Sequence, residues 1–254
     1  FNMPATALIL SPKTTSKAEV SINTDVQSYT YDKSAKAFEI KGTSLTGFTV
    51  SYKQGETPVI NPTNAGTYDV IITRPEDDSY KSYSKTITGG LVINKAVVNV
   101  PTVASKVYTG ENQTAYIPES ELYTETSNEG RTTVGTANVV LTLVDSANYK
   151  WSDGTETATK TIEFAITKAT ANAITGLAIE GWTFGESAKT PSASATFGTP
   201  AFTYVGTGET NYAENATPPA NAGTYKVIAK VADTANYTGA SYEMTFTIAK
   251  ATPS

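Results

Sequence analysis

The chain repeats itself, and this periodicity limits its fold more than any other feature of the sequence. The dipeptide Lys-Ala recurs at Lys17, Lys95, Lys168 and Lys250, in steps of 78, 73 and 82 residues. A fixed internal period is the signature of repeat architectures, in which similar units follow one another along the chain. Units of this length are large enough to be small domains, each with its own apolar core.

Three further landmarks keep a fixed order between successive Lys-Ala pairs. The first is an aromatic residue followed by a turn, at Tyr31, Tyr108 and Phe184. The second is a Gly-Thr pair at Gly66, Gly135 and Gly223, followed in the outer copies by a tyrosine, Tyr68 or Tyr225. The third is a polar turn that ends in Tyr80, Tyr149 or Tyr237. This shared order gives the landmarks a structural role and predicts three repeats, over residues 17–95, 96–168 and 169–254.

Residues 1–16 match none of these landmarks. The apolar run at 7–10 could be the last strand of a preceding module. It could also be a donor strand, because an extended apolar segment can complete the sheet of a neighbouring subunit. The donor-strand alternative would make the chain a fibre subunit.

Each repeat reads as all-β. Residues 67–73 alternate between apolar and polar side chains, and residues 137–144 and 224–231 repeat the pattern. Period-two alternation places every second side chain on one face of a strand. We also expect strands at 20–23, 37–40 and 47–52.

The Gly-Thr-Tyr element before a long strand resembles the tyrosine corner of immunoglobulin-like sandwiches. The predicted fold is therefore three small Ig-like β-sandwich domains in an elongated array. The alternative is a β-grasp arrangement, which requires a short helix; residues 118–123 are the best place for it.

Composition excludes several function classes. The chain has no Cys and no His, which removes Ser-His-Asp and Cys-His catalysis, zinc sites of the usual kind and haem ligation. The net charge of −5 and the scattered basic residues argue against nucleic acid and anionic membranes as partners. No apolar run is long enough to span a bilayer. We expect no enzyme activity and no cofactor.

The landmarks together resemble a known family. Asn64-Ala-Gly-Thr-Tyr68, Asp145-Ser-Ala-Asn-Tyr149 and Phe246-Thr-Ile-Ala-Lys-Ala251 are similar to the MBG-type and related Ig-like repeats of bacterial adhesins. The resemblance covers Lys17 to Ala251 in three copies. It implies a large surface-anchored or secreted polypeptide and an extracellular location. The middle copy departs from the pattern because Ala137 replaces the tyrosine of the corner.

Several side chains are candidate sites. Trp151 and Trp182 are the only tryptophans and are candidate ligand contacts, since an exposed tryptophan can stack on a sugar; the alternative is packing within the sheet. Carboxylates at 76–78, Asp145 and Asp153 could bind calcium, but no Asp-x-Asp-x-Asp loop occurs and a solvated turn explains them as well. The lysines Lys95, Lys168 and Lys250 could form isopeptide bonds, or could simply keep their ammonium groups in water at strand ends.

The function that fits these observations is a non-catalytic stalk or adhesin segment. Its alternatives are a module that binds a carbohydrate or host protein and a self-assembling pilus or filament subunit. The expected partners are accordingly a host glycan, a host protein or other copies of the chain.

Overall fold

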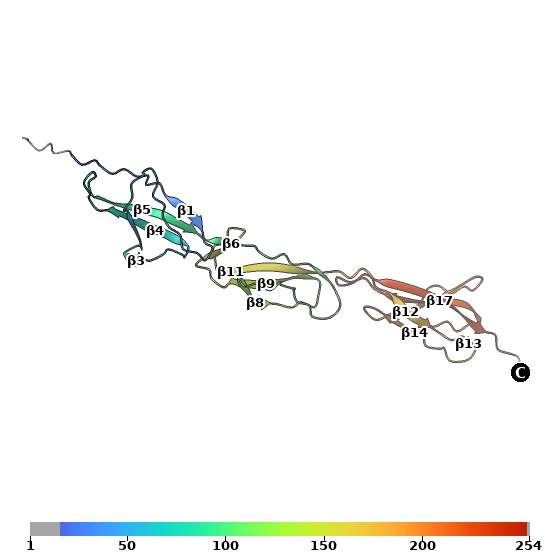
Figure 1. Ribbon diagram of the computed structural model, residues 1–254. Coiled ribbons are helices and arrows are strands. Elements are labelled where there is room, and N and C mark those ends of the chain that lie inside the picture. The colour runs from blue at the N-terminus through green and yellow to red at the C-terminus, as the bar shows by residue number, and fades with distance from the viewer. Residues whose placement is uncertain (1–15, 253–254) are drawn as a thin grey trace, which may run out of the picture. The chain divides into compact units, whose positions relative to one another are not determined.

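The computed structural model describes residues 16–252, which contain strands, turns and irregular segments and no helix (Figure 1). Residues 118–122 form an irregular segment and Tyr123 begins a strand, so the helix that a β-grasp arrangement requires is not present there. Nothing in residues 16–252 has the helical length and hydrophobicity that a membrane span needs. The expected strand at 7–10 lies outside the described residues.

The chain forms two compact units. The first comprises the chain up to Val100 together with Leu143–Ala158. The second comprises Pro101–Thr142 and the chain from Thr159 onward. A hairpin of the predicted second repeat therefore belongs to the same compact unit as the first repeat. The repeat boundaries at Lys95 and Lys168 stay a prediction.

The first unit is built on a five-stranded sheet in the order β1-β5-β4-β2-β3. Its strands are β1 (Gln27–Thr30), β2 (Thr49–Gln54), β3 (Thr57–Val59), β4 (Gly66–Arg74) and β5 (Tyr83–Asn94). β1 runs parallel to β5, and the other neighbours are antiparallel. A separate parallel pair joins β6 (Ala96–Val98) to β10 (Tyr149–Trp151).

The alternation predicted for residues 67–73 is confirmed in β4. Tyr68, Val70 and Ile72 are buried and form a core with Leu91 and Ile93 of β5. Burial of such side chains is the main stabilising term in a domain of this size. The strand expected at 47–52 is also present, as β2.

The strands expected at 20–23 and 37–40 are wrong. Within 20–23 only Asn23 pairs, in an isolated bridge with Lys41, and residues 37–40 are irregular although Phe38 is buried in the same core. For residues 37–40 the reason lies in the backbone hydrogen bonds. The N–H of Phe38 donates to the Tyr52 hydroxyl at 2.8 Å, and that of Glu39 to Gln27 Oε1 at 2.9 Å. Side chains thus satisfy donors that a neighbouring strand would otherwise satisfy.

The second unit contains three sheets. One has the order β7-β11-β9-β8 and another β13-β17-β16-β15, while β12 and β14 form a two-stranded sheet. The bounds are β7 (Lys106–Val107), β8 (Tyr123–Asn128), β9 (Gly135–Leu143), β11 (Thr159–Thr167), β12 (Ile174–Ala178), β13 (Trp182–Thr183), β14 (Ser192–Ala195), β15 (Ala201–Gly206), β16 (Gly223–Val231) and β17 (Ala240–Ala249). β12 lies against β16 and β17, and Ile174 packs on Ala229 and Val231 between the two layers.

The three larger sheets share one topology. The last strand of each sheet pairs antiparallel with the strand that begins at the Gly-Thr landmark. The same last strand pairs parallel with a short early strand, as β1–β5, β7–β11 and β13–β17. The fold is therefore all-β and consists of tandem sheets that fit β-sandwich repeats, as the sequence predicts.

Candidate functional site

A tyrosine closes the corner before the long strand in the outer copies. The Tyr68 hydroxyl donates to the carbonyl of Asn64 at 2.7 Å, and the Tyr225 hydroxyl donates to that of Asn221 at 2.7 Å. Burial raises the pKa of both hydroxyls, so both remain protonated donors. Each bond fixes the residues just before Gly66 or Gly223.

The middle copy closes the same corner with an arginine. Arg131 Nε donates to the carbonyl of Thr133 at 2.8 Å, and Thr133 occupies the position of Asn64. The two terminal nitrogens donate to the carbonyls of Thr136 and Val134 at 3.1 and 2.9 Å. Gly135 has a φ of 135°, and a Cβ there would lie 2.4 Å from the guanidinium. Glycine at this corner therefore makes room for the arginine.

The corner of the first repeat binds Asn148, which comes from the turn of the second. We call this contact the first junction, and it lies wholly within the first unit. Asn148 is 6% exposed, and its Oδ1 accepts from the N–H of Ala65 at 2.7 Å. Its Nδ2 donates to Asn64 Oδ1 at 3.1 Å and to Asp145 Oδ2 at 2.8 Å.

The Lys-Ala pair and the first aromatic landmark complete the first junction. The N–H of Ala96 donates to the carbonyl of Asn148 at 2.9 Å. Lys95 Nζ donates to the carbonyl of Ser146 at 2.8 Å. The Tyr31 and Tyr149 rings meet edge to face with centroids 5.3 Å apart, a favourable aromatic geometry.

The second junction repeats this chemistry within the second unit. Asn236 Oδ1 accepts from the N–H of Val134 at 3.0 Å, and the Asn236 carbonyl accepts from that of Ala169 at 3.0 Å. The Tyr237 ring lies 6.1 Å from Tyr108 and stacks on Phe197 at 5.6 Å. The four landmarks of the sequence therefore meet at both junctions.

The lysine of the second junction forms an ion pair. Lys168 Nζ lies 2.5 Å from Asp233 Oδ1, and hydrogen bonding to Lys168 lowers the pKa of that carboxyl. Both side chains are exposed to solvent. A charged, solvated pair does not have the buried and neutral partners that amide formation requires, so an ion pair accounts for the position of Lys168.

The turn of the first repeat is built differently. It has Ser79 where the other two turns have asparagine. Asp77 accepts from Arg74 and from the N–H groups of Ser79 and Tyr80, and the Arg74 hydrogen bond is the main reason why its pKa falls to about 2. The Arg74 guanidinium also lies over the Tyr80 ring, 5.6 Å from its centroid.

The carboxylates proposed as calcium ligands cap turns. Asp145 Oδ1 accepts from the N–H of Asn148, and Asp153 Oδ1 accepts from that of Thr155. Within residues 16–252 no three acidic side chains come together as a metal site would require. Turn capping therefore accounts for Asp145 and Asp153.

Both tryptophans are buried. Trp151 lies in β10 and is 0% exposed, and Trp182 in β13 is 5% exposed. Trp182 stacks on Phe246 at 5.2 Å inside the core of the third sheet. In this structure neither ring offers a face to a sugar.

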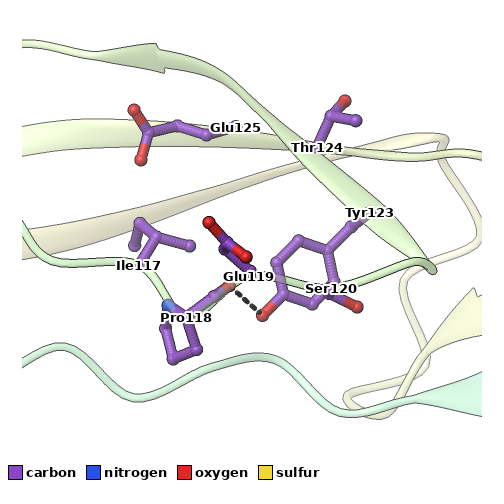
Figure 2. Close-up of a pocket in the computed structure, with 7 residues that line it drawn as sticks. All are labelled: Ile117, Pro118, Glu119, Ser120, Tyr123, Thr124 and Glu125. Carbon is purple, nitrogen blue, oxygen red and sulfur yellow. Dashed lines mark hydrogen bonds between the residues drawn. The ribbon is translucent and has the colours of Figure 1, made fainter.

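A shallow cavity of about 500 Å³ lies beside β8 (Figure 2). It is lined by Ile117–Ser120 and Tyr123–Glu125, and the Tyr123 hydroxyl donates to the carbonyl of Pro118 at 3.2 Å. Ser120 Oγ accepts from the N–H of Leu122, and the chain has no histidine that could activate a hydroxyl. The cavity therefore has no arrangement that points to nucleophilic catalysis.

Sequence reasoning missed three functional residues, namely Asn148, Asn236 and Arg131. The asparagines leave a signal, because both stand just before the tyrosine of the third landmark. Arg131 leaves a weaker one. It is one of only two arginines in the chain and stands next to the single corner that lacks a tyrosine.

A family model described as "MBG domain" matches residues 18–97 and 183–252, together more than half of the chain. Among curated proteins, none matches the sequence.

Among solved structures, the chain is similar to the I-band fragment I67–I69 from titin, with 7% identity, a TM-score of 0.33, and 91% of this chain and 98% of that chain covered. The first four Ig domains of Dscam1 give 9% identity and a TM-score of 0.25, with 91% and 74% covered. The glucan-utilisation protein SGBP-B of Bacteroides ovatus, solved with a mixed-linkage heptasaccharide, gives 15% identity and a TM-score of 0.21, with 95% and 70% covered. At these scores the likeness identifies no relative.

Proposed function

The chain belongs to the MBG-domain family, and from this premise we propose that it is a non-catalytic structural segment of a bacterial surface or secreted protein. In this role it projects another binding region from the cell or contributes to adhesion. The proposal includes an extracellular location, which is typical of proteins with this domain.

One observation carries the proposal. At both junctions the N–H of the residue before the Gly-Thr pair of one repeat donates to the asparagine Oδ1 in the turn of the next repeat. A module built to bind a ligand would instead direct its recurring side chains towards solvent. Repeat-to-repeat contacts of this kind support a mechanical role.

The alternative functions have less support. A carbohydrate-binding module needs an accessible aromatic face, and both tryptophans that the sequence offered for it are buried, although Tyr116 and Tyr242 are exposed. A filament subunit would use residues 1–16 as a donor strand, almost all of which lie outside the described part of the chain. Binding of the chain to host glycans, to host proteins or to other copies of itself is a question for experiment.

Surface display tests the structural role. The full chain is placed between the wall anchor of a Gram-positive host and a reporter that binds coated beads. We expect bead capture to exceed that of a host in which the reporter is joined directly to the anchor. Equal capture by the two hosts would contradict the proposal.

A glycan array probed with the full chain separates the main alternative. The exposed aromatics outside the junctions are then substituted one at a time. Binding by the parent chain that is lost on one of these substitutions would assign a glycan-binding function instead. No binding above background is the result that the structural proposal expects.

A further inference from the structure

The third repeat has the same junction elements as the first two. The N–H of Phe184 donates to the carbonyl of Ala249 at 2.8 Å. Tyr31 and Tyr108 make the equivalent bonds to Asn94 and Thr167, both at 2.9 Å. In all three cases the acceptor is the residue just before the lysine of a Lys-Ala pair. The backbone therefore places Phe184, Lys250 and Ala251 as it places their counterparts in the two junctions.

These elements are exposed in the third repeat. Phe184 is 50% exposed, whereas Tyr31 and Tyr108 are half-buried beneath the tyrosine of the next turn. Ala251 is exposed, whereas Ala169 in the second junction is 3% exposed. Residues 16–252 supply no hydrogen-bond acceptor to the N–H of Ala222, which precedes Gly223 as Ala65 precedes Gly66. We call Phe184, Ala222, Lys250 and Ala251 the repeat-3 junction surface.

Two residues of the repeat-3 junction surface, Ala222 and Phe184, each line a cavity. A cavity of about 540 Å³ is lined by Tyr212, Asn221 and Ala222 among others. A second cavity of about 220 Å³ is lined by Trp182 and Phe184. Both cavities share Pro218 and Ala220, so the corner at Ala222 and the exposed Phe184 ring line two adjoining hollows.

We propose that the repeat-3 junction surface binds a further repeat whose turn has the sequence Asp-x-x-Asn-Tyr. The asparagine Oδ1 of that turn accepts from the N–H of Ala222, as in both junctions already described. The tyrosine ring covers Phe184, and the aspartate pairs with Lys250. The carbonyl of the asparagine accepts from the N–H of Ala251. Binding at this surface is inferred from these contacts and does not depend on the stalk role.

A second copy of this chain is a poorer occupant. Its first repeat would have to present the turn that ends in Tyr80, where Ser79 replaces asparagine. Serine lacks the amide that bonds both the corner N–H and a corner side chain. The Arg74 guanidinium, moreover, already covers the Tyr80 ring. The turn of the first repeat therefore lacks the groups that the repeat-3 junction surface recognises.

A tandem duplication tests the proposal. Residues 170–252 are repeated directly after Ala251 of the full chain, so that Lys250-Ala251 leads into the duplicate as Lys168-Ala169 leads into the original. The two core clusters of the third repeat lie entirely within the duplicated segment. We expect amide exchange at Ala222 to slow by about fivefold to tenfold relative to the parent chain, as for a gained hydrogen bond.

Two controls make the result specific. Asn236→Ala in the duplicate only should return amide exchange at Ala222 to the parent rate. Asn236→Ser in the duplicate, which reproduces the turn of the first repeat, should return it to the same rate. Exchange at Val134 reports that the second junction is intact in every variant. Unchanged Ala222 exchange in the duplicated chain would overturn the proposal. Ala222 protection that rises with concentration in the parent chain would overturn it in favour of a second copy.

Discussion

At the residue scale, a tyrosine and an arginine donate a hydrogen bond to the same backbone carbonyl position at the corner before the long strand. The outer copies use a tyrosine that follows the Gly-Thr pair, and the middle copy uses an arginine that precedes it. Both donate to the carbonyl two residues before the glycine. The shared feature is a side-chain donor for that carbonyl, which is a buried tyrosine hydroxyl in the outer copies and a partly buried guanidinium in the middle one.

Removing the arginine should therefore be reversible by a tyrosine. We expect Arg131→Ala to lower the free energy of unfolding of the second unit by about 0.5–1.5 kcal/mol, since three carbonyls, two of them exposed to water, lose their donor. Ala137→Tyr in the same chain should recover part of this loss, because it restores the tyrosine of the outer copies. The measurement is denaturant unfolding. Ala137→Phe is the matched control, and equal recovery by the phenylalanine would show that the hydroxyl is not responsible.

A second residue-scale prediction concerns acid. Asp77 has a pKa of about 2 in the folded chain, below its ordinary value of 3.8, chiefly because of its hydrogen bond with Arg74. A lowered pKa in the folded state means that the ionised carboxylate stabilises the fold above about pH 4, and that this contribution is lost as the pH falls towards 2.

The Asp77→Asn variant should therefore show a smaller loss of thermal stability between pH 4 and pH 2 than the parent chain. Thermal unfolding followed at several pH values provides the measurement. Glu56→Gln, at a carboxylate that is almost fully exposed, is the control and should leave the profile unchanged. If Asp77→Asn and the parent chain lose the same thermal stability between pH 4 and pH 2, the contact between Asp77 and Arg74 does not contribute to the pH dependence of folding.

At the element scale, the parallel pairing of early and last strands has a mechanical consequence. In a parallel pair the start of one strand and the end of the other lie at opposite ends of the ladder. A force applied to the two ends of a repeat thus loads all bonds of the ladder at once. β1 and β5 pair over four residues, whereas β7–β11 and β13–β17 pair over two each.

We therefore expect the first repeat to unfold at the highest force when the full chain is stretched. Single-molecule force spectroscopy measures this order, and the gain in contour length at each step identifies the repeat. A shortened β1 pairing, made by Ser28→Pro, should lower the force of that step alone. First-repeat unfolding at the lowest force would contradict the expectation.

The sequence predicted the elements whose pattern is local. The strand that begins at Gly66, and its counterparts at Gly135 and Gly223, follow from alternation because each has one face on a core. The segment around Phe38 has the apolar residues of a strand and was predicted as one. Its backbone N–H groups, however, donate to side chains rather than to a neighbouring strand. The partners of Asn148 and Asn236 lie 83 and 102 residues away, and no local pattern reveals a contact at that separation.

At the scale of the whole molecule, each junction is confined to one compact unit. Substitution of the asparagine at one junction should then affect one unit only. We expect Asn148→Ala to lower the unfolding temperature of the first unit and Asn236→Ala that of the second, each by the equivalent of about 1 kcal/mol, because partly buried donors lose their acceptor. Scanning calorimetry measures both transitions.

The exposed Asn138 provides the control, since Asn138→Ala removes an asparagine from β9 without touching a junction. A shift of both transitions by either junction substitution would show that the two units unfold together.

Because the second and third repeats each contain a corner and a turn with the junction asparagine, the gene has a simple way to change its length. Unequal crossing-over between two copies of the coding segment removes or adds a whole repeat, and the newly adjoining ends still present a corner and a turn. An insertion of this kind needs no new interface to evolve. Within this architecture, the number of repeats becomes a trait that recombination can alter in single steps.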